Sequence, residues 1–360
     1  MLFGWLSGRR PMTRENANGE LAPPACSVGP VVLSLDAEGG DHAPLEVVAG
    51  ALEAAGPELQ VLLVGRPQVV EPLLQEADRR YVQFVPSRTV ISCLDEPAAA
   101  VRALPDSSIV VAAQTVANGL SQGLVSAGST GAVLAASLLT IKRASGIRRP
   151  AIVTTLPGER GPVALIDSGA NADCRPEHLL EFGLMGVAFA RTALGIARPR
   201  VGLLNIGEEE AKGTELARAA YGLLRSSGLD FVGNVEGRDL LTGAADVVVT
   251  DGFTGNVALK LLEGSAHSLF NRIRQAANSS LRARLGGMLL RPALRGLRMS
   301  LDPEEYGGAC LLGVRGVVVI CHGNSSRRAI ANALRFGANT VRRALLAALE
   351  EEIAKLRPSA

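Results

Sequence analysis

Two of the few lysines in this chain end glycine-rich polar motifs. Among 37 basic residues the lysines are Lys142, Lys212, Lys260 and Lys355. Lys212 ends NIGEEEAK (205–212) and Lys260 ends DGFTGNVALK (251–260). An ammonium group is a compact point charge that suits an anion such as phosphate. The pattern therefore predicts anion contacts at Lys212 and Lys260, with chance placement as the alternative.

Two motifs share one pattern, GSTGAV at 128–133 and GFTGNV at 252–257. Each follows an apolar run and precedes a helical pattern, so we expect Thr130 and Thr254 to cap helices. The glycines would let backbone amides face outward at the positive end of a helix, where anions bind. A capped helix with nothing bound is the alternative. Walker and GxGxxG motifs are absent, which argues against nucleotide hydrolysis and dinucleotide redox chemistry.

Six polar segments, 126–131 and 250–256 among them, each follow an apolar run, and we expect them to converge on one sheet edge as a binding site. We expect the aspartates to orient donors, because carboxylates repel a bound phosphate. His322 is either a general acid/base or a capping residue. The catalytic candidates are Lys212, Lys260, Asn205, Asn256 and His322. The candidates for substrate and phosphate binding are Asp36, Gly39, Gly40, Asp41, Ser126, Gly128, Ser129, Thr130, Gly131, Asp167, Asn171, Glu208, Asn234, Glu236, Asp251, Gly252, Thr254 and Gly255.

Short apolar runs alternate with helical patterns along most of the chain. The runs lack polar alternation, which is typical of strands buried on both faces of a parallel sheet. The sequence therefore predicts an α/β protein with a three-layer α/β/α, open and largely parallel sheet. The predicted strands are 31–36, 60–65, 82–86, 124–127, 151–156, 163–167, 201–206, 230–233, 247–250 and 317–321. The predicted helices are 44–55, 68–77, 131–143, 176–194, 215–226 and 325–355.

Segment 264–301 breaks this alternation, because it carries seven arginines and no acidic residue. Apolar residues recur at helical spacing, and Pro292 is expected to interrupt the run. A basic face opposite an apolar face is typical of a helical hairpin on anionic lipid. A hairpin packed on the domain or in a dimer interface is the alternative. The candidates for membrane or carrier binding are Arg272, Arg274, Arg282, Arg284, Arg291, Arg295 and Arg298.

Composition excludes several classes of protein. Aromatic residues make up 3% of the chain and the net charge is +2, which argues against a nucleic-acid surface. The five cysteines show no metal-ligand or disulfide spacing, so we expect a reduced cytoplasm and no metal site. No apolar run reaches membrane-spanning length. We expect residues 1–29 to form a flexible extension, 30–345 the α/β domain with the hairpin, and 346–360 the helix end and tail.

Several long motifs in order resemble the PlsX family, the phosphate acyltransferases of bacterial phospholipid synthesis. The resemblance covers about residues 30–340. It rests on DAEGGD (36–41), SAGSTGA (126–132), RPA (149–151), DSGANADC (167–174), LLNIGEEEAKG (203–213), GNVEGRD (233–239), DVVVTDGFTGNVALK (246–260), YGGACLLGVRG (306–316) and HG (322–323). Glu38 stands where the family has Met, and Ser129 where it has Asn. We expect Glu38 to face outward and Ser129 to keep a hydrogen bond, while segment 95–108 lacks the lysines that the family has there.

The resemblance implies conversion of acyl-[acyl-carrier-protein] and inorganic phosphate to acyl phosphate and free carrier protein, without a cofactor or metal. It also implies a fold like isocitrate and isopropylmalate dehydrogenases, a homodimer, and a cytoplasmic protein on the inner face of the membrane. The partners implied are the acyl carrier protein, inorganic phosphate, a second copy, anionic lipid and the membrane glycerol-3-phosphate acyltransferase downstream. The alternatives are an acyl-CoA-using phosphate acyltransferase, a decarboxylating dehydrogenase and a non-catalytic membrane scaffold.

Overall fold

The computed structural model describes residues 29–300 and 307–355, which form one eleven-stranded sheet of order β3-β2-β1-β4-β11-β10-β5-β6-β9-β7-β8. All ten predicted strands are present, with ends shifted by up to two residues. The eleventh strand, β10, was not predicted. The strands are β1 (Val31–Asp36), β2 (Leu59–Gly65), β3 (Val82–Pro86), β4 (Gly123–Ser126), β5 (Ala151–Gly158), β6 (Gly161–Ile166), β7 (Val201–Leu204), β8 (Phe231–Val235), β9 (Val247–Val249), β10 (Ala309–Leu312) and β11 (Val317–Ile320).

The sheet contains two halves whose strands run in opposite directions. In one half β1, β2, β3, β4 and β11 pair in parallel, and in the other β6, β7, β8 and β9 do so. Between them β10 is antiparallel to both β11 and β5, and β5 is antiparallel to β6. Three reversals leave β6 opposite to β11. The carboxyl ends of the two halves therefore lie at opposite edges of the sheet.

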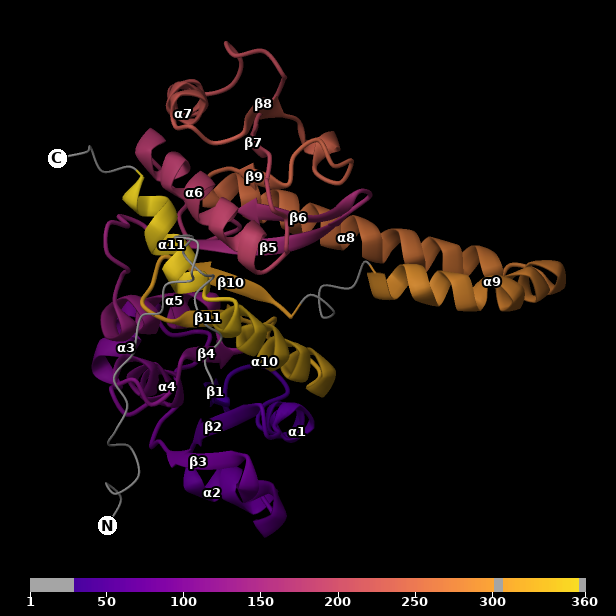
Figure 1. Ribbon diagram of the computed structural model, residues 1–360. Helices are drawn as coiled ribbons and strands as arrows, with labels where there is room; N and C mark the ends of the chain where they lie inside the picture. Colours follow the sequence, from indigo (N-terminus) through magenta and orange to yellow (C-terminus); the bar gives the residue numbers. More distant parts are fainter. Residues whose placement is uncertain (1–28, 301–306, 356–360) are drawn as a thin grey trace, which may run out of the picture.

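Helices cover both faces and give the predicted three-layer architecture (Figure 1). α1, α6, α7, α10 and α11 pack on one face, and α4, α5 and α8 on the other. The helices are α1 (Leu45–Ala54), α2 (Pro67–Val70), α3 (Pro97–Ala103), α4 (Ser108–Ala117), α5 (Thr130–Ala136), α6 (Pro176–Thr192), α7 (Glu215–Ser226), α8 (Gly252–Ala277), α9 (Leu281–Ser300), α10 (Arg327–Arg342) and α11 (Leu345–Ala354).

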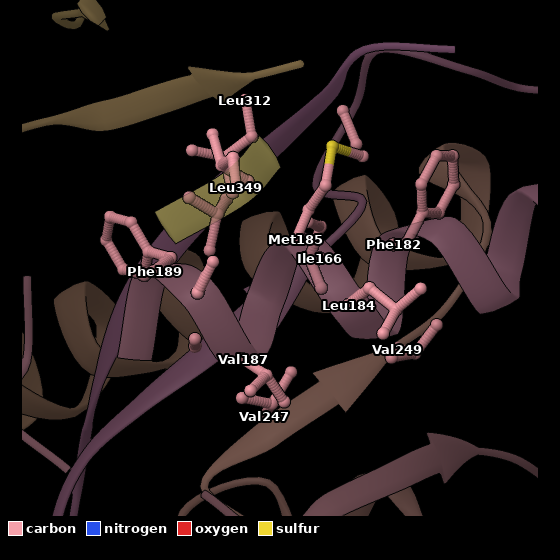
Figure 2. Packing of buried hydrophobic residues seen from close by; sticks show 14 of the residues in the cluster. Ile166, Phe182, Leu184, Met185, Val187, Phe189, Val247, Val249, Leu312 and Leu349 are labelled. Atoms are coloured by element: carbon pink, nitrogen blue, oxygen red, sulfur yellow. The ribbon is translucent and has the colours of Figure 1, made fainter. Parts of the chain in front are cut away.

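Helix α6 supplies much of the core of the second half. Its large side chains Phe182, Met185 and Phe189 are at most 1% exposed and belong to one buried cluster with residues of the sheet and of α11. Figure 2 shows this packing, with Leu312 of β10 and Leu349 of α11 in the same cluster. Burying side chains of this size contributes about 1.5–3 kcal/mol each. The core thus fixes the sheet that positions the loops described below.

Two helix predictions were wrong in detail, and two helices were missed. The predicted helix 325–355 is divided into α10 and α11, because Ala344 adopts a left-handed backbone with φ 54°. The predicted helix 68–77 is the short α2 followed by two 3₁₀ turns, the first of which contains Pro72. Helices α3 and α4 were not predicted.

Helices α8 and α9 lie side by side and project from the body of the molecule (Figure 1). They touch closely, since a Cβ on Gly287 of α9 would stand 2.9 Å from the Cβ of Ala277 of α8. α9 is continuous through Pro292, so the predicted interruption there was wrong. Residues 1–28 of the predicted extension and 356–360 of the predicted tail lie outside the described residues.

Candidate active site

Three loops meet where β1, β4 and β11 end, at what we call the first edge. The buried carboxylate of Asp36 accepts a hydrogen bond from Ser126 Oγ at 2.8 Å, and Ser126 Oγ accepts one from Gly128 N at 3.0 Å. Asp41 N donates to Gly323 O at 2.6 Å, beside His322. Burial raises the pKa of Asp36, although hydrogen bonds from Ser108, Ser126 and the backbone of Glu38 oppose the rise. Asp36 therefore anchors these loops to one another.

Glu38 does not face outward, so that expectation was wrong. Its side chain is 5% exposed and forms an ion pair with Arg66, with Nη2 and Oε1 2.8 Å apart. Arg66 Nε also donates to Glu38 Oε1 at 2.9 Å, and Arg66 N donates to Oε2 at 2.7 Å. Here Glu38 joins the first edge to the start of α2, because Arg66 directly precedes that helix.

Helix α5 begins at the first edge with Ser129 as its N-cap. Ser129 Oγ accepts a hydrogen bond from Ala132 N at 3.2 Å, so the hydroxyl caps the helix and Thr130 does not. Thr130 is the first helical residue and is exposed, while Gly131 lies against Pro97 of α3. Ser129, Gly128 and Gly131 are half-buried, so the start of α5 borders solvent. Gly39 and Gly40 lie beside Gly128 and Gly323.

The loop after β6 begins the second edge, where β6, β7, β8 and β9 end. Asp167 is buried, and its carboxylate accepts hydrogen bonds from the backbone of Ile152, Gly169, Ala170 and Asn171 at 2.7–3.1 Å. Asn171 Nδ2 adds another at 2.8 Å and also donates to Pro150 O. Burial raises the pKa of Asp167, and these hydrogen bonds oppose the rise. The side chain is fully used in holding its own loop.

The first turn of α8 packs directly on this loop. A Cβ on Gly252 would stand 2.7 Å from Asn171 N, and one on Gly255 would stand 1.9 Å from Asp167 O. Asp251 is the N-cap, accepting from Thr254 N and from Thr254 Oγ1 at 2.8 Å, so the predicted cap Thr254 was wrong. Because the two segments lie so close together, the loop that begins at Asp167 covers one side of the N-terminus of α8.

The candidates after β7 and β8 form a separate loop on the second edge. Asn205 Nδ2 donates to Lys212 O at 3.2 Å, and Asn234 Nδ2 donates to Glu209 O at 2.9 Å. The other oxygen of that amide, Asn234 Oδ1, is buried without a partner among the described residues. The two remaining acidic candidates pair with one arginine, since Arg238 Nη2 lies 2.9 Å from Glu236 Oε2 and 4.0 Å from Glu208 Oε1. Lys212 is exposed, with no ion pair among the described residues.

The six polar strand ends do not converge on one edge, so that prediction was wrong. The reversed strands β10 and β5 send the ends of β1 and β4 to one edge and those of β6, β7, β8 and β9 to the other. The starts of α5 and α8, which share the GxTGxV pattern, therefore lie at opposite edges. Among the described residues no hydrogen bond or ion pair joins Lys212 to His322 or Lys260.

Helix α8 nevertheless connects the two edges. Asn256, Lys260 and Glu263 follow at four and three residues, so they lie along one face of the helix. Asn256 contacts Gly169 of the second edge, where a Cβ on the glycine would stand 3.6 Å from Asn256 Oδ1. Further along, Lys260 Nζ lies 2.8 Å from Glu263 Oε2, and His322 Nε2 lies 3.4 Å from Glu263 Oε1. His322, which belongs to the first edge, therefore contacts α8, whose N-terminus lies at the second edge.

Glu263 was missed as a functional candidate. Burial alone would raise its pKa, but the hydrogen bonds and charges of His322 and Lys260 outweigh burial and hold the pKa below its usual value. Its Oε1 is buried without a full hydrogen bond among the described residues and points toward His322. The i,i+3 spacing from Lys260 was visible in the sequence, but His322 is 59 positions away and only the fold joins them.

Burial and geometry bear on Cys174 as a possible nucleophile and on the acidic and histidine side chains as a possible metal site. Burial raises the pKa of the Cys174 thiol to about 12, so this thiol is protonated at neutral pH. The part of the chain that is described holds no group of three or more His, Cys, Asp or Glu side chains arranged for a metal. It also holds no helix long and apolar enough to cross a membrane.

The hairpin of α8 and α9 exposes both basic and apolar side chains. Arg272, Arg274, Arg282, Arg284 and Arg291 are exposed. The large apolar side chains Leu269, Leu285, Met288, Leu289 and Leu290 are 57–78% exposed. Arg295 and Arg298 lie on α9, but their side chains are outside the described residues.

Comparisons with known proteins find matches that cover almost the whole α/β domain. A family model described as "Fatty acid synthesis protein" matches residues 31–347. A protein of Heliobacterium modesticaldum named phosphate acyltransferase is 53% identical over 325 residues, which are 89% of this chain and 97% of that protein. A phosphate acyltransferase of Moorella thermoacetica is 48% identical over 321 residues, 88% and 94% of the two chains.

Solved structures of low sequence identity share the fold. A EutD phosphotransacetylase from Staphylococcus aureus matches with a TM-score of 0.57 at 17% identity, over 86% of this chain and 94% of that one. A 4-hydroxythreonine-4-phosphate dehydrogenase from Klebsiella pneumoniae matches with a TM-score of 0.51 at 12% identity, over 88% and 99%. At these identities the likeness concerns the fold alone, and it confirms the predicted fold class.

Proposed function

This chain belongs to the fatty acid synthesis protein family and is a phosphate acyltransferase, and from that premise we propose that it transfers the acyl group of an acyl-carrier-protein thioester to inorganic phosphate. Membership confirms the resemblance that the motifs predicted. The non-catalytic scaffold is set aside, because relatives of high identity are named as acyltransferases. The carrier substrate, the mechanism, the dimer and the membrane contact are the parts that we propose.

In the proposed reaction a phosphate oxygen attacks the thioester carbonyl carbon. A carbon–oxygen bond forms, the carbon–sulfur bond breaks, and the departing thiolate takes up one proton. No side-chain nucleophile is required, because phosphate itself attacks. The protein must hold the dianion, orient it toward the carbonyl and stabilise the developing oxyanion.

The cluster of Lys260, Glu263 and His322 is the observation that carries the proposal. Lys260 and His322 are two potential cations on either side of one carboxylate, and their side chains are 53% and 45% exposed. Lys260 would hold the phosphate, while His322 would give its proton to the departing thiolate. Glu263 would orient both groups through its two carboxylate oxygens. His322 also adjoins the Gly323 contact to Asp41, which links it to the glycine-rich loops of the first edge.

The glycine-rich loops of the first edge support the same role. The segment from Gly128 to Gly131 borders solvent at the start of α5, and Asp36 holds it from below through Ser126. Donors that are fixed before substrate arrives need no reorganisation when charge develops. Asn256 and Lys212 would act as further donors to the acyl thioester or to phosphate.

The decisive assay combines the enzyme with acyl-carrier thioester and labelled phosphate and measures acyl phosphate by hydroxylamine trapping. We expect enzyme-dependent acyl phosphate in equal amount to the free carrier thiol released. Acyl phosphate no higher than in the enzyme-free control would contradict the proposal. Replacing the carrier by coenzyme A tests the acyl-CoA alternative, which a higher kcat/KM for acyl-CoA would favour.

We also propose a homodimer that uses the exposed stripe Phe253, Val257 and Leu261 on α8. These side chains are 52–67% exposed and follow each other at four-residue spacing, so they form a continuous apolar strip. Val257→Glu should give a monomer in light scattering coupled to gel filtration. Leu94→Glu is the matched control, because Leu94 is 92% exposed in a loop. A dimer in both variants would exclude this strip as the interface.

The hairpin of α8 and α9 is proposed to rest on anionic lipid at the inner face of the cell membrane. Its exposed arginines and apolar side chains match that surface, and lipid contact would pass acyl phosphate to a membrane glycerol-3-phosphate acyltransferase. Replacing Arg272, Arg274, Arg282 and Arg284 by Gln should weaken cosedimentation with anionic vesicles, most strongly at low salt. Equal binding by the variant and wild type would favour hairpin packing against protein.

A further inference from the structure

Six basic residues gather on one surface beside the second edge, and we call them the basic patch. They are Lys142, Arg143, Arg148, Arg149, Arg175 and Arg315, and all six are exposed. Hydrogen bonds link two separate segments of chain, 142–149 and the one that carries Arg315. Arg143 Nη1 donates to Arg148 O at 2.7 Å, and Arg315 Nε donates to Arg143 O at 3.0 Å. Burial, together with the charges of Arg149, Arg175 and Arg148, holds the pKa of His178 below its usual value, so these three arginines lie near one side chain.

In the part of the chain that is described, the basic patch has few ion pairs. Several arginines elsewhere pair with a carboxylate in the described residues, as in Arg66–Glu38, Arg191–Glu352, Arg200–Asp246, Arg225–Glu210, Arg327–Glu46 and Arg335–Glu53, while others such as Arg79 and Arg198 do not. In the basic patch only Arg148 has such a partner, Glu181, at 3.5 Å. The other five have none among the described residues. Like charges held together without counter-charges favour an anionic ligand.

Two of these side chains are already ordered. The guanidinium groups of Arg143 and Arg315 are tied to backbone carbonyls, and each still has other N–H donors to offer. Groups fixed before binding lose less conformational entropy when a partner arrives. Arg143 and Arg315 are therefore a preformed part of this cationic surface.

An apolar hollow of about 200 Å³ adjoins the basic patch. Arg315 is one of its walls, and the others include Val116, Val341 and Leu345. Such a hollow takes up a single apolar side chain that projects from a partner. The patch segments 142–149 and 313–316 contain no large exposed apolar side chain, while Leu139, three residues before Lys142, is 43% exposed. Cationic groups around a recess fit an acidic protein surface better than a membrane.

The basic patch also borders the second edge of the candidate site. Pro150, next to Arg149, accepts the hydrogen bond of Asn171 Nδ2 at 2.8 Å, and Asn171 O accepts one from Gly252 N at 2.8 Å. These two hydrogen bonds, both made by Asn171, connect the residue after Arg149 to the first residue of α8. Helix α8 is the helix that carries Lys260.

From these observations we propose that the basic patch is the docking surface for the acidic face of the acyl carrier protein. This rests on the proposed function, of which it names the protein-binding surface. Electrostatic pairing across such an interface speeds and orients encounter, while the hollow would receive one apolar side chain of the carrier.

The test is the double variant Arg149→Glu/Arg175→Glu, with Arg79→Glu/Arg198→Glu as the control of equal charge change. Arg79 and Arg198 are exposed and have no ion pair among the described residues. We expect the patch variant to raise KM for the acyl-carrier thioester roughly tenfold at low salt, with a smaller difference at high salt. KM for phosphate and for acyl-pantetheine, a small thioester without the carrier, should not change. The control variant should resemble wild type.

Two further measurements separate the possible outcomes. Equal KM for the carrier thioester in both variants would overturn the docking proposal. So would a patch variant that loses binding to anionic vesicles but keeps its carrier KM, because the surface would then bind lipid. Calorimetric binding of the unloaded carrier protein tests the surface independently of chemistry. Failure of wild type to form acyl phosphate, with carrier binding still lost in the patch variant, would sink the proposed function and leave the docking surface.

Discussion

The two edges of the sheet use the same residue types for different purposes. Each has a buried aspartate at a strand end and a helix that starts with the GxTGxV pattern. At the second edge Asp167 accepts five hydrogen bonds from its own surroundings, and α8 packs against that loop without space for a methyl group. At the first edge Asp36 anchors loops in which Gly39 is buried against Gly128, while Gly128 and Gly131 are half-buried and border solvent. One motif therefore forms a structural joint in one place and a candidate ligand loop in the other.

We expect the largest effect on stability from a glycine substitution at the second edge, compared with the same substitution at the first edge. Gly255→Ala places a Cβ 1.9 Å from Asp167 O, a backbone atom, and should reduce the free energy of unfolding by about 3 kcal/mol. Gly128→Ala meets Ser126 Oγ at 3.1 Å and should cost about 1 kcal/mol or less. Urea denaturation measures both.

Gly264 offers a matched control on the same helix as Gly255. It has open space around its Cβ position and is exposed, so Gly264→Ala should stabilise α8 by about 0.5–1 kcal/mol. Equal urea midpoints for Gly255→Ala and Gly128→Ala would show that the second edge is not the tighter joint.

The next effect concerns phosphate. Lys260→Ala removes the ammonium group beside His322 and should lower kcat/KM for phosphate by about 100-fold without unfolding the protein. Lys212→Ala, on the other edge, should also weaken phosphate use, but by about tenfold. Initial rates at varied phosphate measure both, and circular dichroism checks the fold. Unchanged phosphate saturation in both variants would refute an anion role for either lysine.

A smaller effect tests the link between the edges. Glu263→Gln should lower kcat by about tenfold, because Lys260 and His322 lose the carboxylate that orients them. Initial rates at saturating substrate measure kcat, and Glu263→Asp, which keeps a carboxylate, should lose less activity than Glu263→Gln. A kcat equal to that of wild type in Glu263→Gln would leave Glu263 with a packing role only.

The same carboxylate has a predictable effect on stability. The pKa of Glu263 is lower in the folded state than its ordinary value, so its ionised form stabilises the fold above the unfolded-state pKa. That contribution is lost as the pH falls through the folded-state pKa. The difference in melting temperature between wild type and Glu263→Gln should therefore be present at pH 7 and vanish in acid. A difference that grows in acid would contradict the sign.

The smallest expected effect lies at the outside of the first edge. Glu46 of α1 pairs with Arg327 at the start of α10, which lowers the pKa of Glu46 to about 2. Because this folded-state pKa lies below the ordinary value, the stabilisation is complete above about pH 4.5 and is lost toward pH 2. The pair is exposed, so Glu46→Gln should change the melting temperature little at pH 7. A large change there would mean that this pair holds the first edge in place.

Much of the fold was predictable because buried strands leave a local signal. The run 31–36 and its nine counterparts are apolar without alternation, and each is a strand of the sheet. The four-residue strand β10 follows two glycines with positive φ, Gly307 and Gly308, and its short run gave little signal. Helix α3 begins with Pro97 and is rich in alanine, so its pattern lacks a large apolar stripe.

The site was less predictable than the fold, because it depends on pairings distant in sequence. Whether six polar strand ends share an edge is decided by the antiparallel strands β10 and β5, and nothing within 167–171 or 126–131 records that choice. Glu38 was expected outside because its partner Arg66 is 28 residues away. Local spacing could suggest Lys260 and Glu263 together, but only the tertiary structure adds His322.

Helix α8 has a mechanical consequence. It is one continuous helix of 26 residues, about 39 Å long, with Gly252 clamped at one end and the projecting hairpin at the other. A stiff rod that is clamped at its base converts a sideways push on its tip into a tilt along its length. Lys260 and Glu263 stand between the clamp and the tip, opposite His322. A sideways force on the hairpin would therefore tilt α8 and change the distance between Glu263 and His322.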